Sequence, residues 1–227
     1  MKKVLIINPN SSEKMTKDIK ETVDKLNLEN IEITVINMKK APTVLESFTD
    51  YTKASCEVIE IVEGLSGYDG VLLACFGDPG LFALKEICPV PIIGVGEAAF
   101  SLAQLLGYKF SVIAASTKAK PMMDQMVFSY GVGDRLASIE TLNLPIEDFL
   151  YNEGLLLEKV VDKSKKAMDS GAEVIIFGCA GMTMLDDKLE KQLSVAVIDP
   201  IKAGVVMLVA ILTGGFHISK SGLYENL

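Results

Sequence analysis

The chain of 227 residues is long enough for one large domain or two small ones, and 49% of its residues are hydrophobic while 23% are charged. This composition is typical of a protein with a large buried core and excludes a disordered chain. The formal net charge of −8 and the lack of any long Lys/Arg run argue against a nucleic-acid partner, because binding a polyanion requires a basic surface.

The histidine and cysteine content limits metal and redox chemistry. The only histidine is His217, and no CxxC pair is present, so we expect no metal site. The four cysteines are Cys56, Cys75, Cys88 and Cys179. The apolar run at residues 4–7 is too short for a signal peptide, and we expect a cytoplasmic protein whose thiols stay reduced.

Short apolar runs alternate with amphipathic segments from the start of the chain. Residues 3–8 (KVLIIN) form a continuous apolar run that stops at Pro9, as expected of a parallel strand covered on both faces. A helix should follow, because Ser11 or Ser12 can cap the next amphipathic segment. Further strands are predicted at 31–37, 70–75 and 91–95, and helices at 51–65 and 97–106. The alternation predicts an α/β fold with mostly parallel sheet flanked by helices.

The order of these motifs then repeats. The segments at 109–116, 173–179 and 196–200 resemble those at 3–10, 69–75 and 91–95. Any α/β protein repeats a strand–loop–helix pattern, but three blocks in one order at an offset of roughly 105 residues favour an internal duplication. We therefore expect two pseudosymmetric α/β domains.

The longest apolar stretch lies near the end of the chain. Residues 203–216 are fewer than the roughly 18 needed to cross a bilayer. Gly214 and Gly215 at the end of this stretch are typical of a helix C-cap. We expect a buried helix here and no membrane partner.

Cys75 and Cys179 occupy equivalent places in the repeat, each at the carboxyl end of a predicted strand and before a turn. Ligands of open α/β sheets collect at this edge, and the start of a following helix would favour the thiolate. Two thiols facing each other across an interdomain cleft could act as base and acid on opposite faces of one carbon, as a racemase requires. A lone cysteine more often fills a core, and we interpret Cys56 and Cys88 in that structural way.

Small polar residues follow the first strand of each repeat. Asn10, Ser12, Ser116 and Thr117 could bind carbonyl oxygens and stabilise the negative charge that develops as a proton leaves. Ordinary helix capping explains the hydroxyl residues equally well. Asn10 is the stronger candidate, because Pro9 makes the turn ahead of it rigid.

The chain resembles the aspartate/glutamate/hydantoin racemase superfamily, particularly its hydantoin and allantoin racemase branch. The resemblance rests on INPNSS, ACFGDPGL, VPIIGVGEAA, FGCAGM, AVIDP and SKSGLYE, in that order along nearly the whole chain. It implies cofactor-independent racemisation by Cys75 and Cys179 in a cleft between two α/β domains. It also implies that the C-terminal segment returns to the first domain, which gives expected domains of 1–97 plus 207–227 and of 98–206.

The residues after the two cysteines bear on the substrate. Members similar to aspartate or glutamate racemases tend to have Asn-Thr after the first cysteine and Thr with another polar residue after the second. Here Phe76-Gly77 and Ala180-Gly181 stand instead, and an apolar wall with bare backbone N–H groups suits a neutral ring amide. We expect a 5-substituted hydantoin or allantoin as substrate, with an aspartate/glutamate racemase or a maleate-type isomerase as alternatives.

Other classes of protein fit less well. Residues 94–99 (GVGEAA) match G-x-G-x-x-A, but no acidic residue ends a strand about 20 residues later, which argues against a dinucleotide-binding oxidoreductase. The second thiol argues against a one-thiol decarboxylase. A module that binds a metabolite without turnover is a further alternative. We also expect a small-molecule substrate and a homo-oligomer.

Overall fold

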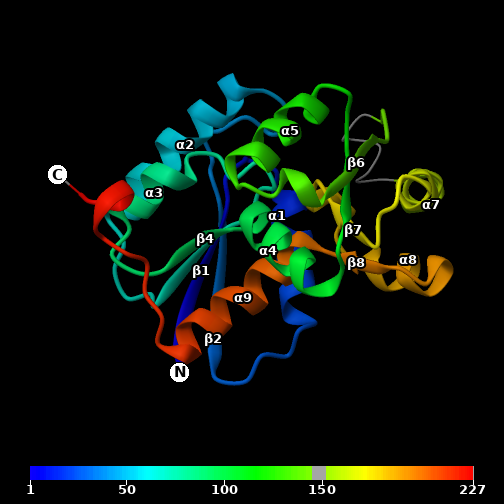
Figure 1. Ribbon diagram of the computed structural model, residues 1–227. Coiled ribbons are helices and arrows are strands. Elements are labelled where there is room, and N and C mark those ends of the chain that lie inside the picture. Colours follow the sequence, from blue (N-terminus) through cyan, green and yellow to red (C-terminus); the bar gives the residue numbers. More distant parts are fainter. Residues whose placement is uncertain (145–151, 227) are drawn as a thin grey trace. The chain divides into compact units, whose positions relative to one another are not determined.

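The computed structural model describes residues 1–144 and 152–226. They form two compact units: the first contains Met1–Val95 and the chain from Gly204 onward, and the second contains Gly96–Ala203. Each unit has one four-stranded sheet with helices packed against it, and every strand pair is parallel (Figure 1). The expected α/β fold with two parallel sheets is confirmed.

The first unit has the strand order β2-β1-β3-β4. Its strands are β1 (Lys2–Asn8), β2 (Ile31–Asn37), β3 (Gly70–Leu73) and β4 (Ile92–Gly94). Its helices are α1 (Glu13–Asp24), α2 (Phe48–Glu63), α3 (Leu81–Ile87) and the 3-10 helix η3 (Gly222–Tyr224).

The second unit has the corresponding order β6-β5-β7-β8. Its strands are β5 (Phe110–Ala114), β6 (Leu136–Thr141), β7 (Val174–Phe177) and β8 (Ala196–Ile198). Its helices are α5 (Ala119–Ser129), α7 (Glu153–Asp169) and α8 (Asp186–Leu193), with 3-10 helices η1 (Gly133–Arg135) and η2 (Ala180–Met182). α4 (Val95–Leu106) starts at the boundary between the units. In this order β1, β3 and β4 match β5, β7 and β8.

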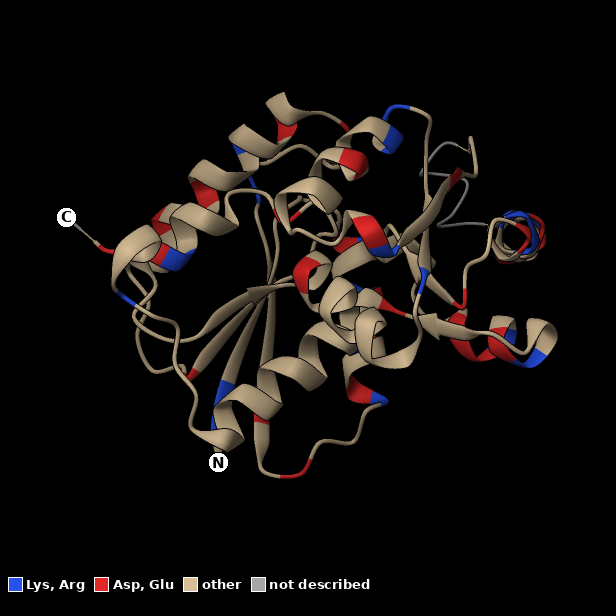
Figure 2. Ribbon diagram, viewed as in Figure 1, with Lys and Arg blue, Asp and Glu red and all other residues tan. Residues whose placement is uncertain are grey.

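The hydrophobic pattern of the sequence explains these elements. Ile6 and Ile7 of β1 are fully buried, and burying an aliphatic side chain of this size stabilises the fold by about 1.5–3 kcal/mol. α1 turns Met15, Ile19 and Val23 toward the core, which is the spacing of an amphipathic helix. Charged residues lie mainly on the helices and loops, as Figure 2 shows for α7 and α8. The central strands can therefore be apolar on both faces.

The last long helix, α9 (Pro200–Gly214), begins in the second unit and continues in the first. Its Leu212 packs so closely on β3 that a β-carbon on Gly70 would lie 3.0 Å from Leu212 Cδ1. The expectation of a buried helix is correct for one face only, because that face covers the sheet while Val206 on the other is 49% exposed. Gly215 ends the helix at φ 71°, the left-handed conformation that the glycine pair predicted. Within residues 1–144 and 152–226, no helix is long and apolar enough to span a bilayer.

Candidate active site

Cys75 and Cys179 leave their sheets at matching points. The N–H of Ala74 donates to the carbonyl of Ile7 at 2.8 Å, and the N–H of Gly178 donates to the carbonyl of Ile113 at 2.9 Å. Ile7 pairs with Leu73 in the first sheet as Ile113 pairs with Phe177 in the second. Each thiol therefore comes one residue after an equivalent hydrogen bond, and both thiols are half-buried.

The turn after Cys179 brings a hydrogen-bond donor to the sulfur. Cys179 is the N-cap of η2, and the N–H of Gly181 donates to Sγ at 3.4 Å. A donor directed at sulfur favours the thiolate over the thiol, because it stabilises negative charge. Gly178, just before the cysteine, allows the end of β7 to pack closely on β5: a β-carbon there would lie 2.9 Å from the carbonyl oxygen of Ile113.

The turn after Cys75 is built differently. The N–H of Asp78 donates to the carbonyl of Cys75 at 2.9 Å, and the N–H of Leu81 then donates to the carbonyl of Asp78 at 3.1 Å. Asp78 has φ 42° and Gly80 has φ 74°, so the chain reverses through two left-handed residues before α3 begins. Phe76 is 2% exposed, so its side chain is buried.

Tyr51 of α2 lies against this turn. A β-carbon on Gly77 would be 2.1 Å from Tyr51 Oη, so the hydroxyl occupies the side of Gly77 that any other residue would fill. Ser55, one helical turn further, fills the corresponding space beside Gly80, where a β-carbon would lie 2.6 Å from Ser55 Oγ. Tyr51 is not among the site residues expected from the sequence. In the sequence, the only indication of this contact is the glycine spacing, Gly77 and Gly80, of the turn against which α2 packs.

Asn10 belongs to a buried network within the loop after β1. Its Oδ1 accepts from Asn8 Nδ2 at 2.9 Å and from the N–H of Ser12 at 2.8 Å. Its Nδ2 lies 3.4 Å from Met15 Sδ, which is a weak acceptor. The oxygen of Asn10 thus holds the loop in shape, and the amide nitrogen is the part of the side chain suited to a ligand carbonyl.

Each serine of the candidate site accepts a hydrogen bond from a backbone N–H at the start of a helix. Ser12 Oγ accepts from the N–H of Met15 at 3.2 Å at the start of α1, and Ser116 Oγ accepts from the N–H of Ala119 at 3.3 Å at the start of α5. Capping uses each oxygen as an acceptor, so each hydroxyl proton is still able to donate. Thr117, next to Ser116, has an exposed side chain. The capping interpretation is therefore correct for Ser12, the N-cap of α1. The N-cap of α5 is Lys118, so Ser116 only bonds to the first residue of that helix, and neither bond excludes a second role.

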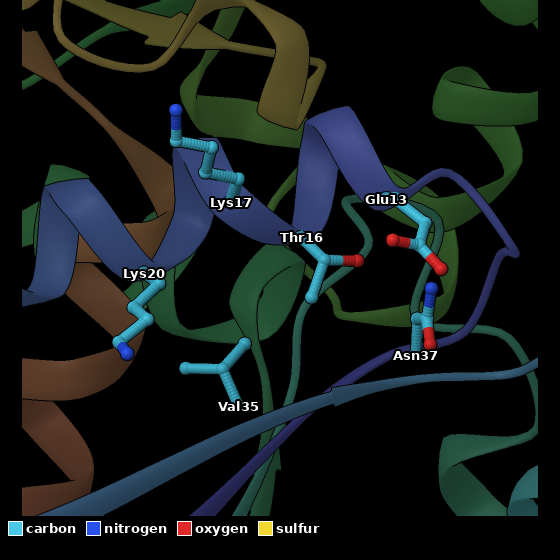
Figure 3. Close-up of a pocket in the computed structure, with 6 residues that line it drawn as sticks. All are labelled: Glu13, Thr16, Lys17, Lys20, Val35 and Asn37. Atoms are coloured by element: carbon cyan, nitrogen blue, oxygen red, sulfur yellow. The ribbon is translucent and has the colours of Figure 1, made fainter.

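A cavity of about 280 Å³ lies between α1 and β2 of the first unit (Figure 3). Its lining residues are Glu13, Thr16, Lys17, Lys20, Val35 and Asn37. Thr16 Oγ1 accepts from Asn8 Nδ2 at 2.9 Å, and Asn37 Nδ2 donates to the carbonyl of Ser11 at 3.5 Å. The cavity thus borders the outer side of the Asn10 loop, and neither Cys75 nor Cys179 is among its lining residues.

The other two cysteines differ from each other. Cys88 is fully buried among Leu84 and Ile92, and burial raises the pKa of its thiol, as expected of a structural residue. Cys56 lies on the exposed side of α2. Ala54 and Val58 of α2 are buried, and Cys56 lies on the other side of this helix. The expectation that Cys56 is a structural core residue was therefore wrong.

Comparison with known proteins decides the family. A family model described as Asp/Glu/Hydantoin racemase matches residues 4–208. The chain belongs to the Asp/Glu/hydantoin racemase family. Within that family, a hydantoin racemase of Paenarthrobacter aurescens is 34% identical to this chain over 228 residues, which are 99% of this chain and 97% of the relative.

Two solved structures from the racemase family have the same fold. An allantoin racemase from Klebsiella pneumoniae is 30% identical with a TM-score of 0.95, and the match covers 100% of this chain and 94% of the other. An allantoin racemase from Pseudomonas fluorescens is 25% identical with a TM-score of 0.94, over 99% and 97% of the two chains. The resemblance inferred from the motifs is confirmed, and so is the expected class of enzyme, a racemase-type isomerase.

Proposed function

We propose that the protein interconverts the enantiomers of a 5-substituted hydantoin or of allantoin, with Cys75 and Cys179 as its two acid–base groups. The observation that carries this proposal is the matched pair of half-buried thiols, each one residue beyond an equivalent hydrogen bond at the end of a strand. The hydantoin and allantoin racemases among its relatives support the choice of substrate class.

The proposed reaction moves one proton off the ring carbon and another onto it. The thiolate of one cysteine removes the proton at C5, and the electron pair of the broken C–H bond moves into the adjacent carbonyl to give an enolate. The thiol of the other cysteine then donates its proton to the opposite face of C5 and becomes the thiolate. After one turnover the two sulfurs have exchanged protonation states, so the reverse reaction uses the same groups in opposite roles. The reaction as proposed uses no cofactor.

The remaining candidate residues bind and polarise the ring in this proposal. Carbonyl oxygens of the substrate would accept from the Asn10 amide and from the hydroxyls of Ser12, Ser116 and Thr117. Backbone N–H groups at Gly77 and Ala180 would contribute further donors, and Gly181 would act through its bond to Cys179 Sγ, while Phe76 limits the space behind its turn. Donors fixed before the reaction stabilise the enolate more than the neutral ring, which lowers the barrier to proton removal.

Deuterium exchange tests the function directly. A single enantiomer of allantoin or of 5-benzylhydantoin is incubated with the protein in deuterated water, beside a blank without protein, and followed by polarimetry and mass spectrometry. We expect loss of optical rotation above the blank, with deuterium at C5. Aspartate, glutamate and maleate are assayed in parallel, and turnover of one of these alone would favour the corresponding alternative. A metabolite-binding module would bind a hydantoin without exchange.

Substitution of the thiols tests the mechanism. Cys75→Ser and Cys179→Ser should each abolish full racemisation, whereas Cys56→Ser, which changes an exposed thiol on α2, serves as the matched control and should retain it. Undiminished racemisation by Cys75→Ser would rule out the two-thiol assignment even if the substrate is right.

A further inference from the structure

At each cysteine turn one buried carboxylate lies between the turn and the end of the neighbouring strand, but the turn supplies this carboxylate in the first unit and the strand end supplies it in the second. In the first unit, the acid is Asp78 in the turn, and it faces Gly94 at the end of β4: a β-carbon on Gly94 would lie 2.2 Å from Asp78 Oδ1. In the second unit, the acid is Asp199, directly after β8, and it faces the turn that follows Cys179. Gly94 and Asp199 are matched positions of the repeat, so the acid has changed sides between the halves.

Asp199 ties the Cys179 turn to the start of α9. Its Oδ2 accepts from the hydroxyl of Thr183 and from the N–H of Met184, the latter at 3.2 Å. Its Oδ1 accepts from the N–H groups of Ile201 at 2.8 Å and Lys202 at 3.4 Å. The carboxylate is 2% exposed, so these four donors satisfy a group that has left water.

Asp186 and Lys202 interact electrostatically with Asp199. Asp186 opens α8 and is paired with Lys202, whose Nζ lies 2.5 Å from Asp186 Oδ2 and 3.8 Å from the exposed Asp187. Burial, together with the charge of Asp186, raises the pKa of Asp199, whereas the hydrogen bond from Thr183 lowers it. The carboxylate of Asp199 is thus enclosed by the turn to which it is hydrogen-bonded.

Asp78 is constrained in a comparable way. It is 7% exposed, and its backbone adopts φ 42°, which residues with a β-carbon rarely do. Its N–H donates to the carbonyl of Cys75, so the orientation of Asp78 and that of the cysteine residue are coupled through one hydrogen bond. The absence of a side chain at Gly94 is what allows the carboxylate to take this position.

We propose that Asp199 and Asp78 are positioning residues, which hold the turns after Cys179 and Cys75 in the conformations that their thiols need for proton transfer. The role of the thiols rests on the proposed function. For Cys179 the held feature is the bond from the N–H of Gly181 to Sγ, because Thr183 and Met184 follow η2 directly. Loosening the turn loses this bond and with it the preference for the thiolate.

Thiol reactivity, measured for each cysteine separately, tests the proposal without relying on racemisation. The folded protein is alkylated with iodoacetamide between about pH 6 and pH 10, the range in which cysteine ionises, and the modified peptides are quantified by mass spectrometry. In Asp199→Asn, an amide replaces one acceptor by a donor. Alkylation of Cys179 should fall about tenfold at neutral pH and recover at high pH, while that of Cys75 should not change.

The competing explanations give different profiles. Simple loss of the Asp199 charge would make Cys179 more reactive at neutral pH, and local disorder would make it more reactive at every pH. Either result, or an unchanged profile, overturns the proposal for Asp199. Asp187→Asn removes an exposed carboxylate on the same helix as Asp186 and should leave both profiles as they are. Thr183→Val should lower the alkylation of Cys179 at neutral pH, as Asp199→Asn does. Thr183→Ser keeps the hydroxyl and should give the same alkylation profile as the unmodified protein.

The counterpart in the first unit is tested through Gly94. Gly94→Ala places a β-carbon where Asp78 lies and should alter the Cys75 profile while that of Cys179 stays unchanged. Gly64→Ala is the matched control, because the nearest atom to its β-carbon would be 3.8 Å away. If Gly94→Ala leaves Cys75 unaffected, the role of Asp78 is refuted. If the unmodified protein fails to racemise any hydantoin, the proposed function fails, whereas the alkylation result stands on its own.

Discussion

The backbone N–H of Gly181 donates to the Sγ of Cys179, two residues earlier in the chain, across 3.4 Å. The interaction strengthens when the sulfur carries negative charge, since a thiolate is a better acceptor than a thiol. In the proposed reaction Cys179 alternates between these two forms. The turn thus stabilises the thiolate of Cys179, which is the form that removes a proton. An N-cap side chain stabilises the first amides of a helix in the same way.

The two thiols should have separable roles in exchange. In Cys75→Ser and in Cys179→Ser, racemisation should fall by about a hundredfold or more, because one of two acid–base groups is lost. Each variant should still exchange the C5 proton of one enantiomer with deuterated water, and the preferred enantiomer should differ between the variants. Proton NMR of each enantiomer in deuterated buffer measures this. The same enantiomer preference in both variants would contradict opposed thiols.

Gly178→Ala should destabilise the protein by about 1–3 kcal/mol, the usual cost of forcing atoms into a packed interior. The added β-carbon would lie 2.7 Å from Met123 Cε and 2.9 Å from the carbonyl oxygen of Ile113, and the second contact is with backbone that has little room to move. Urea denaturation measures the change. Gly133→Ala in the same unit, where no atom lies within 4 Å of the new carbon, is the control. Equal effects of the two substitutions would show that the close approach is unimportant.

Ser12→Ala should cost about 1 kcal/mol of stability, because α1 loses its N-cap. Ser47 caps α2 in the same way, and Ser47→Ala should cost a similar amount. If Ser12 also binds substrate, only Ser12→Ala should lower kcat/KM for the hydantoin. Equal kinetics in the two variants would assign Ser12 to capping alone.

The pH dependence of stability should reveal Asp199. Its folded pKa is raised by burial, so the folded state binds the proton more tightly than the unfolded state, and the stability contributed by Asp199 is lost as the pH rises above about 3.8. The free energy of unfolding of Asp199→Asn, relative to that of the unmodified protein, should therefore be higher at pH 7 than at pH 4. Urea denaturation at the two pH values measures this difference.

Asp50 provides the comparison of opposite sign. The hydrogen bond from Ser47 lowers the pKa of the Asp50 carboxyl from its ordinary value of 3.8. The stability contributed by Asp50 is therefore present above about pH 3.8 and is lost as the pH falls through the lowered pKa. The free energy of unfolding of Asp50→Asn, relative to that of the unmodified protein, should be lower at pH 7 than at pH 4. Trends of the same sign in both variants would contradict the burial argument for Asp199.

Cys56 and Cys88 should differ in accessibility. A thiol-specific reagent such as a maleimide should modify Cys56 in the folded protein, because this residue is exposed on α2. Cys88 is fully buried and its pKa is raised by burial, so it should react only after denaturation. Peptide mass spectrometry before and after addition of urea distinguishes the two. Early modification of Cys88 would indicate that the core around α3 opens readily.

Local pattern was sufficient to predict much of the fold. The strand at 31–37 agrees with β2 in both bounds, and the repeat correctly matched the strands that precede Cys75 and Cys179. The helix expected at 51–65 starts earlier, at Phe48, because Ser47 caps it. The strand expected at 70–75 ends at Leu73, because the chain turns as soon as Ala74 has bonded to Ile7.

The surroundings of the thiols were harder to predict. Tyr51 reaches the Cys75 turn from α2, the helix that precedes β3, and a tyrosine in an amphipathic helix gives no local signal of such a contact. Asp199 was recognised only as part of a repeat block and a family motif, without a role of its own, and its bonds to Thr183 and Met184 depend on the packing of β8 beside β7. Long-range contacts of this kind follow from the assembled sheet and not from residue spacing.

The change of side of the buried acid limits how the two halves can be recombined. A chimera that carries the CFGDPG turn in place of CAGMTM would bring the aspartate of that turn against Asp199, two carboxylates in one enclosed space. The reciprocal graft would leave Gly94 facing a turn without its acid. Although the halves share strand order and thiol placement, each turn is compatible only with its own neighbouring strand, so an exchange between them has to include both segments at once.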